Sequence, residues 1–433
     1  MRSWNATRQL DGEPVGRHPA RLPRLLPSGL KAAPTSLAEH LDGNGPLPAV
    51  GPDRRARQAL IAQVERSGLT GRGGAGFPTG RKLAAVAARS NAVVVANGTE
   101  GEPASGKDKV LLAQSPHLVL DGAAVAADLV GARRVVIVAH HAVREIVDAA
   151  TAERRRARID RVPVRVLTAA DRFVAGEASA VVHWVSGGRP IPTRTPPRMS
   201  QKGLGGRPTL VQNVETLAHL ALIARHGADW FRSIGTPPEP GSMLVTVLGA
   251  VREPRVIEIA IGTPIQELIA LAGGATQPVQ ALLLGGYFGS WVGWETAARL
   301  PFSSAGLAGT GASLGAGLVA ALPADACGLT ETARVVGYLA EESAGQCGAC
   351  VFGLPAVAAE LDRIVHGRTA DLSTLHRWLG QINGRGACSL PDGFVQLIRS
   401  ALAVFDHELQ QHAQGGCTAI VTSPVLPVPR RSP

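Results

Sequence analysis

The amino-acid sequence predicts an α/β protein that ends in an all-helical region, and three observations lead to this fold class. Between about residues 92 and 167, strand-like apolar runs alternate with helical stretches, which is typical of a parallel sheet covered by helices. Residues 243–284 follow a strand, strand, helix, strand order and indicate a small β-grasp-like unit. From residue 330 to about 412 the apolar spacing is helical, with breaks at glycines.

At 433 residues the chain is too long for one ordinary core, so we expect several domains. The predicted plan is an arm rich in proline and arginine (1–50), an α/β domain (51–238), a β-grasp domain (239–328), a helical bundle (329–414) and a proline-rich tail (415–433). In the first half we expect helices at 53–67, 80–89, 113–129 and 142–155, and strands at 92–96, 134–139 and 162–167. In the β-grasp unit we expect strands at 243–249, 256–261 and 281–284 and a helix at 264–272.

Composition excludes several classes of function. The 44 lysines and arginines outnumber the 34 aspartates and glutamates, but they form no long basic run and do not interleave with aromatics, so we expect no nucleic-acid binding. Five cysteines do not make a disulfide framework in a chain of this length, and no apolar signal sequence opens it. The uncharged stretch at about 300–324 is too weakly apolar to span a bilayer. We therefore expect a cytoplasmic protein without direct membrane insertion.

Three cysteines near the C-terminus carry the strongest chemical signal. Cys347 and Cys350 form a C-x-x-C, and Cys388 follows in a second glycine-containing segment. This pattern is typical of a metal site or an iron–sulfur cluster. Such clusters normally take four thiolates, and the residue three positions before Cys347 is Ala344. The alternative is that the C-x-x-C is a relic of a motif that no longer binds metal.

A glycine-rich loop is the second signal. Residues 71–82 read G-R-G-G-A-G-F-P-T-G-R-K. Glycines let backbone N–H groups gather around a phosphate, and the N-terminus of the following helix adds its dipole. Lys82 lies in the first turn of that helix and could pair with the same phosphate. The loop departs from the dinucleotide fingerprint because a helix precedes it, and glycines also serve tight turns, so the loop alone leaves both interpretations open.

Taken together, these motifs resemble a known family. Four further segments match it in order: N-G-T-E-G-E-P at 97–103, A-G-E-A-S-A at 175–180, P-T-L-V-Q-N-V-E-T at 208–216 and E-S-A-G-Q-C-G-A-C at 342–350. With them, the chain resembles the NADH-oxidising, FMN-binding flavoprotein subunit of respiratory complex I and the related subunits of soluble hydrogenases and formate dehydrogenases. The resemblance implies a Rossmann-like FMN domain, a β-grasp domain of the SLBB type and a four-helix bundle that holds a [4Fe–4S] cluster.

The resemblance also implies roles for individual residues. It places Gly71, Gly73 and Lys82 at the FMN phosphate and Phe77 against the nicotinamide dinucleotide. It makes Glu102 the catalytic residue beside the nicotinamide and Cys347, Cys350 and Cys388 the cluster ligands. The remaining implied FMN contacts are Asn97, Glu100, Gly176, Glu177, Asn213 and Thr216.

The sequence departs from the family pattern at both ends of the electron path. On the nicotinamide side, Ala85 replaces a second phenylalanine of the family pattern, Ala178 replaces a glutamate and Arg198 replaces another phenylalanine. The loss of these stacking and polar contacts weakens the case for NAD(H) binding. On the cluster side, Ala344 removes one thiolate. The cluster would then be a three-ligand variant, either [3Fe–4S] or [4Fe–4S] with an outside ligand, unless Cys417 folds back as a substitute.

These observations predict an oxidoreductase that passes electrons between a donor, FMN, an iron–sulfur cluster and a protein acceptor. The predicted partner is a ferredoxin or a thioredoxin-like [2Fe–2S] subunit, and the donor is a nicotinamide dinucleotide or, with electrons running the other way, reduced ferredoxin. Two alternatives stay open: an ordinary NADH-input subunit of complex I, and a scaffold that keeps the fold without redox function.

Overall fold

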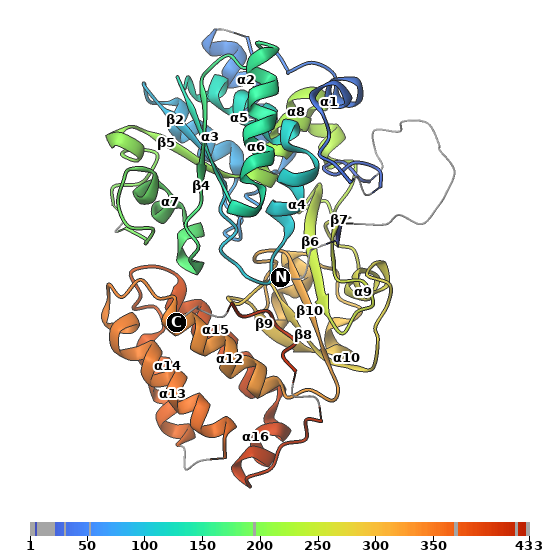
Figure 1. Cartoon of the computed structure of the whole chain (residues 1–433), viewed down its shortest axis with the longest axis vertical. Helices are drawn as coiled ribbons and strands as arrows, with labels where there is room; N and C mark the ends of the chain where they lie inside the picture. The colour runs from blue at the N-terminus through green and yellow to red at the C-terminus, as the bar shows by residue number, and fades with distance from the viewer. Residues whose placement is uncertain are drawn as a thin grey trace.

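The computed structural model describes residues 5–6, 22–29, 32–51, 53–193, 196–367, 371–420 and 423–429. Much of the expected arm (1–4, 7–21, 30 and 31) and part of the expected tail (421–422 and 430–433) lie outside these described residues. Figure 1 shows an α/β region above, a second sheet below it and a group of helices beside that second sheet.

The α/β region is built on a parallel sheet with strand order β4-β3-β2-β5. β2 lies inside the sheet and pairs with β3 in register Val94 to Val135 and with β5 in register Val93 to Thr209. The strands are β2 (Val93–Gly98), β3 (Val135–Ala139), β4 (Val164–Thr168) and β5 (Thr209–Asn213), and the helices are α1 (Leu37–Asn44), α2 (Arg54–Ser67), α3 (Thr79–Ala87), α4 (Lys107–Gln114), α5 (Pro116–Val130), α6 (Arg144–Arg156), α7 (Ala178–Val185) and α8 (Val214–Arg232). The predicted parallel sheet is confirmed. The apolar pattern did not predict β5 or the helices α1, α4, α7 and α8.

The two faces of this sheet are covered differently. Val94, Ala96 and Ile137 point to the large core under α2, α3, α5 and α8, whereas Val93 and Val95 point to a smaller core under α7. Alternation of this kind follows from the two-residue period of a strand. α5 and α8 approach so closely that a Cβ at Gly122 would lie 1.8 Å from the carbonyl oxygen of Leu217.

The helix expected at 113–129 is α5 (Pro116–Val130), and a separate helix that was not expected, α4 (Lys107–Gln114), precedes it. α4 ends at Gln114, and α5 begins with Pro116 at its first position, where the missing N–H costs no helical hydrogen bond. The two helices are bent by 97°. No single helix among the described residues is long and apolar enough to cross a membrane. Taken together, the bent pair α4 and α5 has enough length and apolar content, but nearly all of α5 is buried inside the protein.

The second sheet has strand order β1-β7-β6-β10-β8-β9 and is mixed, with β6 parallel to β10 and antiparallel to β7. Its strands are β1 (Asn5–Ala6), β6 (Ser242–Gly249), β7 (Arg255–Ala260), β8 (Val279–Leu284), β9 (Ser290–Gly293) and β10 (Leu318–Pro323). One face packs on α9 (Ile265–Leu271), α10 (Trp294–Ala297) and α11 (Ser304–Leu307). The other face packs on the C-terminal helices, so along β8 Leu282 faces the first group and Leu283 faces the second.

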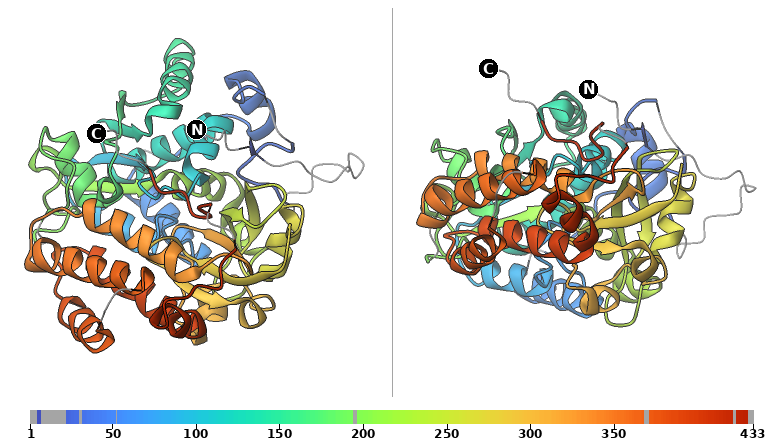
Figure 2. Two further views of the ribbon diagram at one scale, coloured as in Figure 1. Left: turned by 60° about the horizontal axis from the view of Figure 1, so that its bottom comes forward. Right: turned by 90° about the horizontal axis from the view of Figure 1, so that it is seen from below.

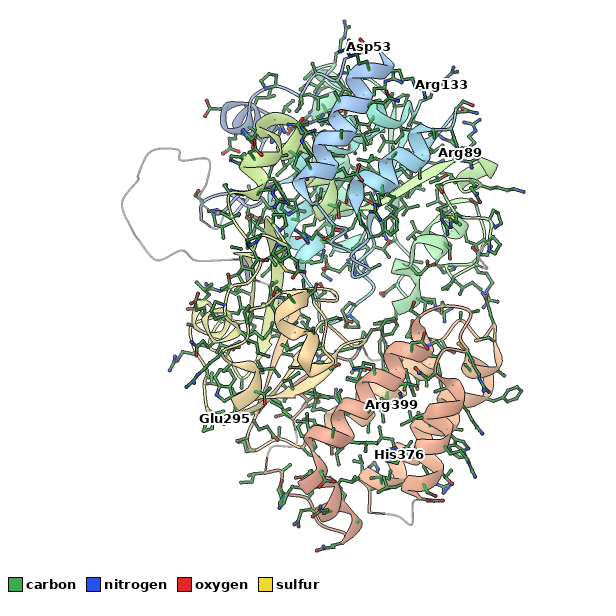
Figure 3. All side chains as sticks on the ribbon, turned by 180° about the vertical axis from the view of Figure 1, so that it is seen from behind. Asp53, Arg89, Arg133, Glu295, His376 and Arg399 are labelled. Carbon is green, nitrogen blue, oxygen red and sulfur yellow. The ribbon has the colours of Figure 1, made fainter. Side chains whose placement is uncertain are left out.

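The C-terminal helices are α12 (Gly328–Glu341), α13 (Leu354–Val365), α14 (Leu372–Ile382), α15 (Leu390–Val404) and α16 (Asp406–Ala413), with a short π-helical turn, η5 (Ala349–Gly353), before α13. The glycine breaks expected near 345, 367 and 384–386 fall between these helices. Figure 3 shows side chains filling the space between the helices and the adjoining sheet, while Glu295 on α10 and Asp53 at the start of α2 lie at the outside.

Residues 423–429, which we call the C-terminal strap, pack against the body of the protein. The backbone N–H of Leu426 donates to Glu331 on α12 (2.9 Å), and the hydroxyl of Tyr287 donates to the carbonyl of Pro427 (2.6 Å). Leu426 is buried in the same core as the C-terminal helices. In Figure 2 the red C-terminal segment runs back across the orange helices. The strap is therefore part of the packed structure despite its proline-rich composition.

Candidate functional site

The glycine-rich loop connects α2 to α3 at the end of the sheet where the strands terminate. Two backbone hydrogen bonds close it at its base, from Gly71 N–H to the Phe77 carbonyl (2.9 Å) and from Thr79 N–H to the Leu69 carbonyl (2.9 Å). Gly74 has φ of +100°, which L side chains rarely adopt. The loop is thus a fixed turn whose backbone is open on its outer side, next to the N-terminus of α3.

The inner side of the loop rests on β5 and α8. A Cβ at Gly73 would lie 3.3 Å from the Cβ of Asn213, so only glycine fits there without displacing the asparagine. The backbone N–H of Arg72 donates to the hydroxyl of Thr216 (2.9 Å), and its buried guanidinium donates to the carbonyl of Ser242 on β6 (3.1 Å). Arg72 thereby joins the two sheets, a role that the sequence reading missed. Thr216 holds the loop through its oxygen.

Lys82, in the first turn of α3, is partly buried, and its ammonium has no hydrogen bond or ion pair within the described part of the chain. Burial without a nearby carboxylate lowers the pKa of Lys82 to about 8. An ammonium group in this position is stabilised by any anion that binds in front of the loop, because the anion restores the favourable charge interaction. The arrangement fits a phosphate group.

The ends of β2 and β5 bring together three of the predicted cofactor residues. Asn97 and Asn213 are paired in register, and the amide of Asn97 donates to the carbonyl of Gly176 (2.8 Å). The amide of Asn213 donates to Asp108 on α4 (2.7 Å), and its oxygen caps α8 by accepting from Glu215 N–H (3.0 Å). Asn97, Gly176 and Asn213 therefore form one continuous surface beside the glycine-rich loop.

The two predicted glutamates use their carboxylates to hold backbone. Glu100, at φ of +47°, accepts from the N–H groups of Asp108 and Lys109 (2.9 Å each) and so caps α4. Glu177 caps α7 by accepting from the N–H of Ser179 (2.8 Å). Burial opposes ionisation of Glu100, but nearby Lys109 and Lys107 outweigh it and lower its pKa. Both glutamates shape the cofactor surface as helix caps.

A buried ion-pair group lies directly behind this surface. The ammonium of Lys107 contacts Asp108 (2.6 Å) and Glu215 (2.9 Å), and the other oxygen of Glu215 accepts from the N–H of Leu244 on β6. None of these residues was singled out from the sequence. One feature of the sequence pointed to this group: Lys107 is one of very few lysines in a chain whose basic residues are nearly all arginines.

Glu102 lies where the α/β region meets the second sheet. Its carboxylate accepts from the backbone N–H of Tyr287 (2.9 Å) and more weakly from that of Ala104 (3.4 Å). Burial raises the pKa of Glu102 to about 7, against the opposing effect of these two hydrogen bonds. A carboxyl group with this pKa can hold or release a proton near neutral pH. Phe77, at the end of the loop, is 55% exposed and offers a free aromatic face.

The three predicted metal ligands converge at the start of α15 and around η5. Cys347 and Cys350 are hydrogen-bonded to each other, and the charges of Cys347 and Cys388 both act on Cys350. Burial and these two neighbours raise the pKa of the Cys350 thiol to about 12. Burial also disfavours the Cys347 thiolate, but backbone N–H groups of Ala387, Cys350 and Ala349 outweigh this effect and lower its pKa. Convergent thiols with N–H groups directed at sulfur fit an iron–sulfur cluster.

The fourth ligand position and Cys417 are far from each other. Ala344 packs on the same helical core as the three cysteines. Cys417 instead lies next to Cys327, which caps the opposite end of α12. The 14 residues of α12 rise about 21 Å, so Cys417 does not replace the missing thiolate. The hypothesis that it folds back to this position is wrong.

The flavin-side and cysteine-side residues meet at η2 (Phe173–Gly176). The charge of Glu177 acts on the Cys388 thiol. Arg172 donates to the carbonyl of Ser343 (3.1 Å), and the N–H of Phe173 donates to Glu342 (2.9 Å). The segment that carries the A-G-E-A-S-A motif is thus bound directly to the segment that carries the cysteines.

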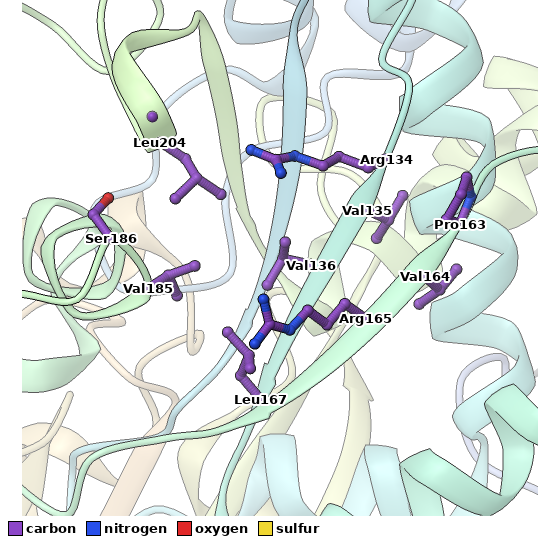
Figure 4. A pocket seen from close by; sticks show the side chains of 11 residues that line it. Arg134, Val135, Val136, Pro163, Val164, Arg165, Leu167, Val185, Ser186 and Leu204 are labelled. Carbon is purple, nitrogen blue, oxygen red and sulfur yellow. The ribbon is translucent and has the colours of Figure 1, made fainter.

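The cavity in Figure 4, of about 310 Å³, lies elsewhere. It is bounded by β3, β4, the C-terminal end of α7 and the turn at Leu204–Gly206, with Arg134 and Arg165 at its wall. None of the predicted site residues lines it, so it is separate from the surface built around the glycine-rich loop.

Comparison with known proteins agrees with this geometry. The Nuo51 FMN-binding domain matches residues 64–222, the SLBB domain 244–286 and the NADH-ubiquinone oxidoreductase-F iron-sulfur binding region 330–412. The second F-type subunit of the NADH-quinone oxidoreductase of Rhizobium meliloti (strain 1021) is 31% identical over 375 residues, which cover 82% of this chain and 89% of that protein. The chain belongs to the family of F-type subunits of NADH-quinone oxidoreductase. Another member, the F-type subunit of Streptomyces coelicolor (strain ATCC BAA-471 / A3(2) / M145), is 32% identical over 83% of this chain and 84% of its own length.

Two further similarities extend to hydrogenases. The HndC subunit of the NADP-reducing hydrogenase of Solidesulfovibrio fructosivorans is 29% identical over 85% of this chain and 80% of its own length. The crystal structure of NAD+-reducing [NiFe]-hydrogenase in the H2-reduced state superposes with a TM-score of 0.79 at 28% identity, covering 87% of this chain and 66% of that chain. The predicted family and fold class are confirmed. This member of the F-type family is an FMN- and iron–sulfur-dependent electron-transfer oxidoreductase, and because its relatives are subunits, it is expected to work with partner subunits.

Proposed function

We propose that the chain transfers electrons between FMN, held on the surface around the glycine-rich loop, and a cluster held by Cys347, Cys350 and Cys388. The observation that carries this proposal is the direct contact between the two sites, through Arg172 and Phe173 on one side and residues 342–343 on the other. When bound, FMN supplies two-electron chemistry on one side and one-electron chemistry toward the cluster. A path of this kind requires the two sites to be neighbours, and the contacts of residues 172–173 with residues 342–343 support this.

In this proposal the residues of the chain bind and orient the cofactors. The loop backbone from Gly71 to Gly76 and the ammonium of Lys82 bind the phosphate. Asn97, Gly176 and Asn213 form the surface on which the rest of the flavin lies, while Glu100, Glu177 and Thr216 fix the backbone that carries it. Glu102 is positioned to hold a proton at its carboxylate at neutral pH.

We propose boundaries for the corresponding units at residues 51–238, 239–328 and 329–414. The sheets and helices described above support this division, because each unit contributes its own sheet or helical layer. The cluster would be a three-cysteine variant, because Ala344 offers no ligand atom.

The electron donor is proposed to be a nicotinamide dinucleotide, as the names of the relatives indicate for those proteins. The exposed face of Phe77 and the raised pKa of Glu102 support it. Ala85, Ala178 and Arg198 reduce the contacts that such a ligand would have, so reduced ferredoxin is the second candidate. We propose a ferredoxin or a thioredoxin-like [2Fe–2S] subunit as the partner, in the cytoplasm.

One preparation tests these alternatives. Protein purified without oxygen is analysed for flavin and iron, and its absorbance is followed as NADH, NADPH and reduced ferredoxin are added in turn. Bleaching of bound flavin by NADH or NADPH supports the nicotinamide donor, and bleaching by reduced ferredoxin alone supports the second candidate. Absence of flavin and iron after reconstitution would overturn the proposal and leave a scaffold without redox function.

Lys82→Met provides a sharper test of the flavin site, with Arg81→Met as the matched control. Both residues are cations in the first turn of α3, but Arg81 is exposed and faces Glu65 (3.9 Å). If Lys82 pairs with the phosphate, its removal weakens FMN binding by about tenfold or more, whereas Arg81→Met changes it less than about threefold. Equal effects of the two substitutions would contradict the assignment.

A further inference from the structure

We propose a second metal site, of the structural zinc type, formed by Cys327, Glu408, His412 and Cys417. One ligand atom from each residue lies within 4.8 Å of all the others. The imidazole Nε2 of His412 is 3.3 Å from the sulfur of Cys327 and 3.4 Å from a carboxylate oxygen of Glu408. The first three side chains are buried and Cys417 is exposed, so the group has one open side through which an ion can enter.

The fold assembles this group from three parts of the chain. Cys327 is the N-cap of α12, and Glu408 and His412 are four residues apart on α16, which places both on one face of that helix. After α16 the chain reverses at Gly415, whose φ is +76°, and this turn returns Cys417 toward the same face.

Neighbouring groups orient the ligand atoms. The N–H of Thr330 donates to the sulfur of Cys327 (3.3 Å), in the first turn of a helix whose dipole stabilises negative charge. The N–H of Thr418 donates to Glu408 (3.0 Å), and its hydroxyl donates to the second carboxylate oxygen. The N–H of Ile420 donates to the carbonyl of Asp325 (2.9 Å), which fixes the segment that follows Cys417. Such supporting hydrogen bonds are typical of ligands in metal sites.

The donor set selects the metal. Two thiolates, one imidazole and one carboxylate suit Zn²⁺, which prefers four ligands in a tetrahedron; Mg²⁺ and Ca²⁺ prefer oxygen ligands. Four protein ligands leave no open coordination position, so the site is structural. Metal binding displaces the two thiol protons. Because α12 separates this group from Cys347, Cys350 and Cys388, the two sets bind metal independently.

The consequence is a clip at the C-terminal end of the helical region. The metal would join α16 to the start of α12 and fix the chain at Cys417, shortly before the C-terminal strap. The strap in turn contacts Glu331 on α12 and Tyr287, whose backbone N–H donates to Glu102. The site would therefore help to hold the strap against Tyr287, the residue that contacts Glu102.

Zinc binding by the full-length protein tests the proposal. Protein prepared under reducing conditions is stripped of weakly held metal, and its zinc and iron are counted together. We expect one zinc per chain in the wild type and in Cys347→Ala, which disturbs only the three-cysteine group. In Cys417→Ser, which changes an exposed ligand and is not expected to disturb the core, we expect at least about tenfold weaker Zn²⁺ binding in competition with a chromophoric chelator. Co²⁺ added in place of Zn²⁺ should give thiolate-to-cobalt charge-transfer absorbance in the wild type and in Cys347→Ala, with a markedly weaker band in Cys417→Ser.

Three results would overturn the proposal. One is the absence of stoichiometric zinc in folded wild-type protein supplied with Zn²⁺. Another is equal zinc binding by the wild type and Cys417→Ser. The third is a Cys327–Cys417 disulfide in protein prepared with reductant, seen by mass spectrometry as the loss of two hydrogens. Circular dichroism of each variant shows whether it is folded, and limited proteolysis after Leu409 reports independently on whether zinc tightens this end of the chain.

Discussion

Replacing Glu102 by glutamine should stabilise the protein in a pH-dependent way. Burial raises the pKa of this carboxyl from its ordinary value of 4.5 to about 7, so the folded state binds the proton more tightly than the unfolded state. The stability that this proton contributes is fully present below pH 4.5 and is lost as pH rises to about 7. Glutamine stays neutral and can still accept from Tyr287 N–H, so it keeps the contact without the ionisation cost.

The difference between the two pKa values corresponds to at most about 3 kcal/mol above pH 7. Glu102 is only partly buried, so solvent screening reduces this to about 2 kcal/mol. For the α/β unit of residues 51–238, this gain in unfolding free energy corresponds to a rise of about 4–8 °C in the melting temperature at pH 8. Roughly a quarter of the gain remains at pH 5. Calorimetric scans at one fixed rate, with and without added FMN, measure the melting temperatures of Glu102→Gln and of the wild type.

Glu295→Gln is the matched control, because Glu295 lies exposed on α10 (Figure 3) and its substitution should change the melting temperature little at either pH. If Glu102→Gln gives the same shift at pH 5 and pH 8, the stabilisation does not come from the proton equilibrium of Glu102. A loss of stability at pH 8 would also refute the reasoning.

Three further predictions concern the cluster and the contacts between units. Ala344→Cys should raise the iron content toward four per chain and make the cluster more resistant to oxygen, measured by iron analysis and electron paramagnetic resonance; unchanged iron would show that position 344 does not face the cluster. Tyr287→Phe removes the hydrogen bond to Pro427 and should cost about 1 kcal/mol of unfolding free energy and speed proteolysis of the strap; unaltered proteolysis would contradict the role of this contact. Arg172→Leu should slow electron transfer from flavin to cluster while leaving flavin reduction unchanged, followed by stopped-flow absorbance; slowing of both steps would point to a general structural effect.

Much of the fold could be predicted because its periodicity is local. The alternating apolar runs at β2 and β3 and the glycine breaks between α12 and α15 follow directly from strand and helix periods. α4 was not predicted, and α5 was expected to begin at residue 113 because the apolar pattern continues through the break that Pro116 marks. β5 was missed because only two of its five residues, Leu210 and Val211, are apolar, and its last two, Gln212 and Asn213, are polar. Their polarity is needed where the strand ends at the cofactor surface.

The sequence indicated which residues belong to the candidate site, but it did not indicate what their side chains do. The motifs indicated Glu100, Glu177 and Thr216, yet only the structure shows that their side chains cap helices and fasten the loop. The contacts of Tyr287 with Glu102 and of Arg72 with Ser242 join residues far apart in the sequence, which no local pattern reports. The same holds for Cys327 and Cys417, whose proximity depends on the placement of α16 and the turn after it at the start of α12.

The strand order of the parallel sheet has a consequence for biosynthesis. β2 emerges from the ribosome early, but its neighbour β5 begins at Thr209, and the intervening chain takes about 6–23 s to synthesise at ordinary rates of translation. During this interval the Val93–Gly98 strand, wholly apolar over its first residues, presents an unpaired edge that can associate with other nascent chains. The yield of correctly assembled protein should therefore depend on chaperones that shelter this edge and on the speed of translation between β4 and β5.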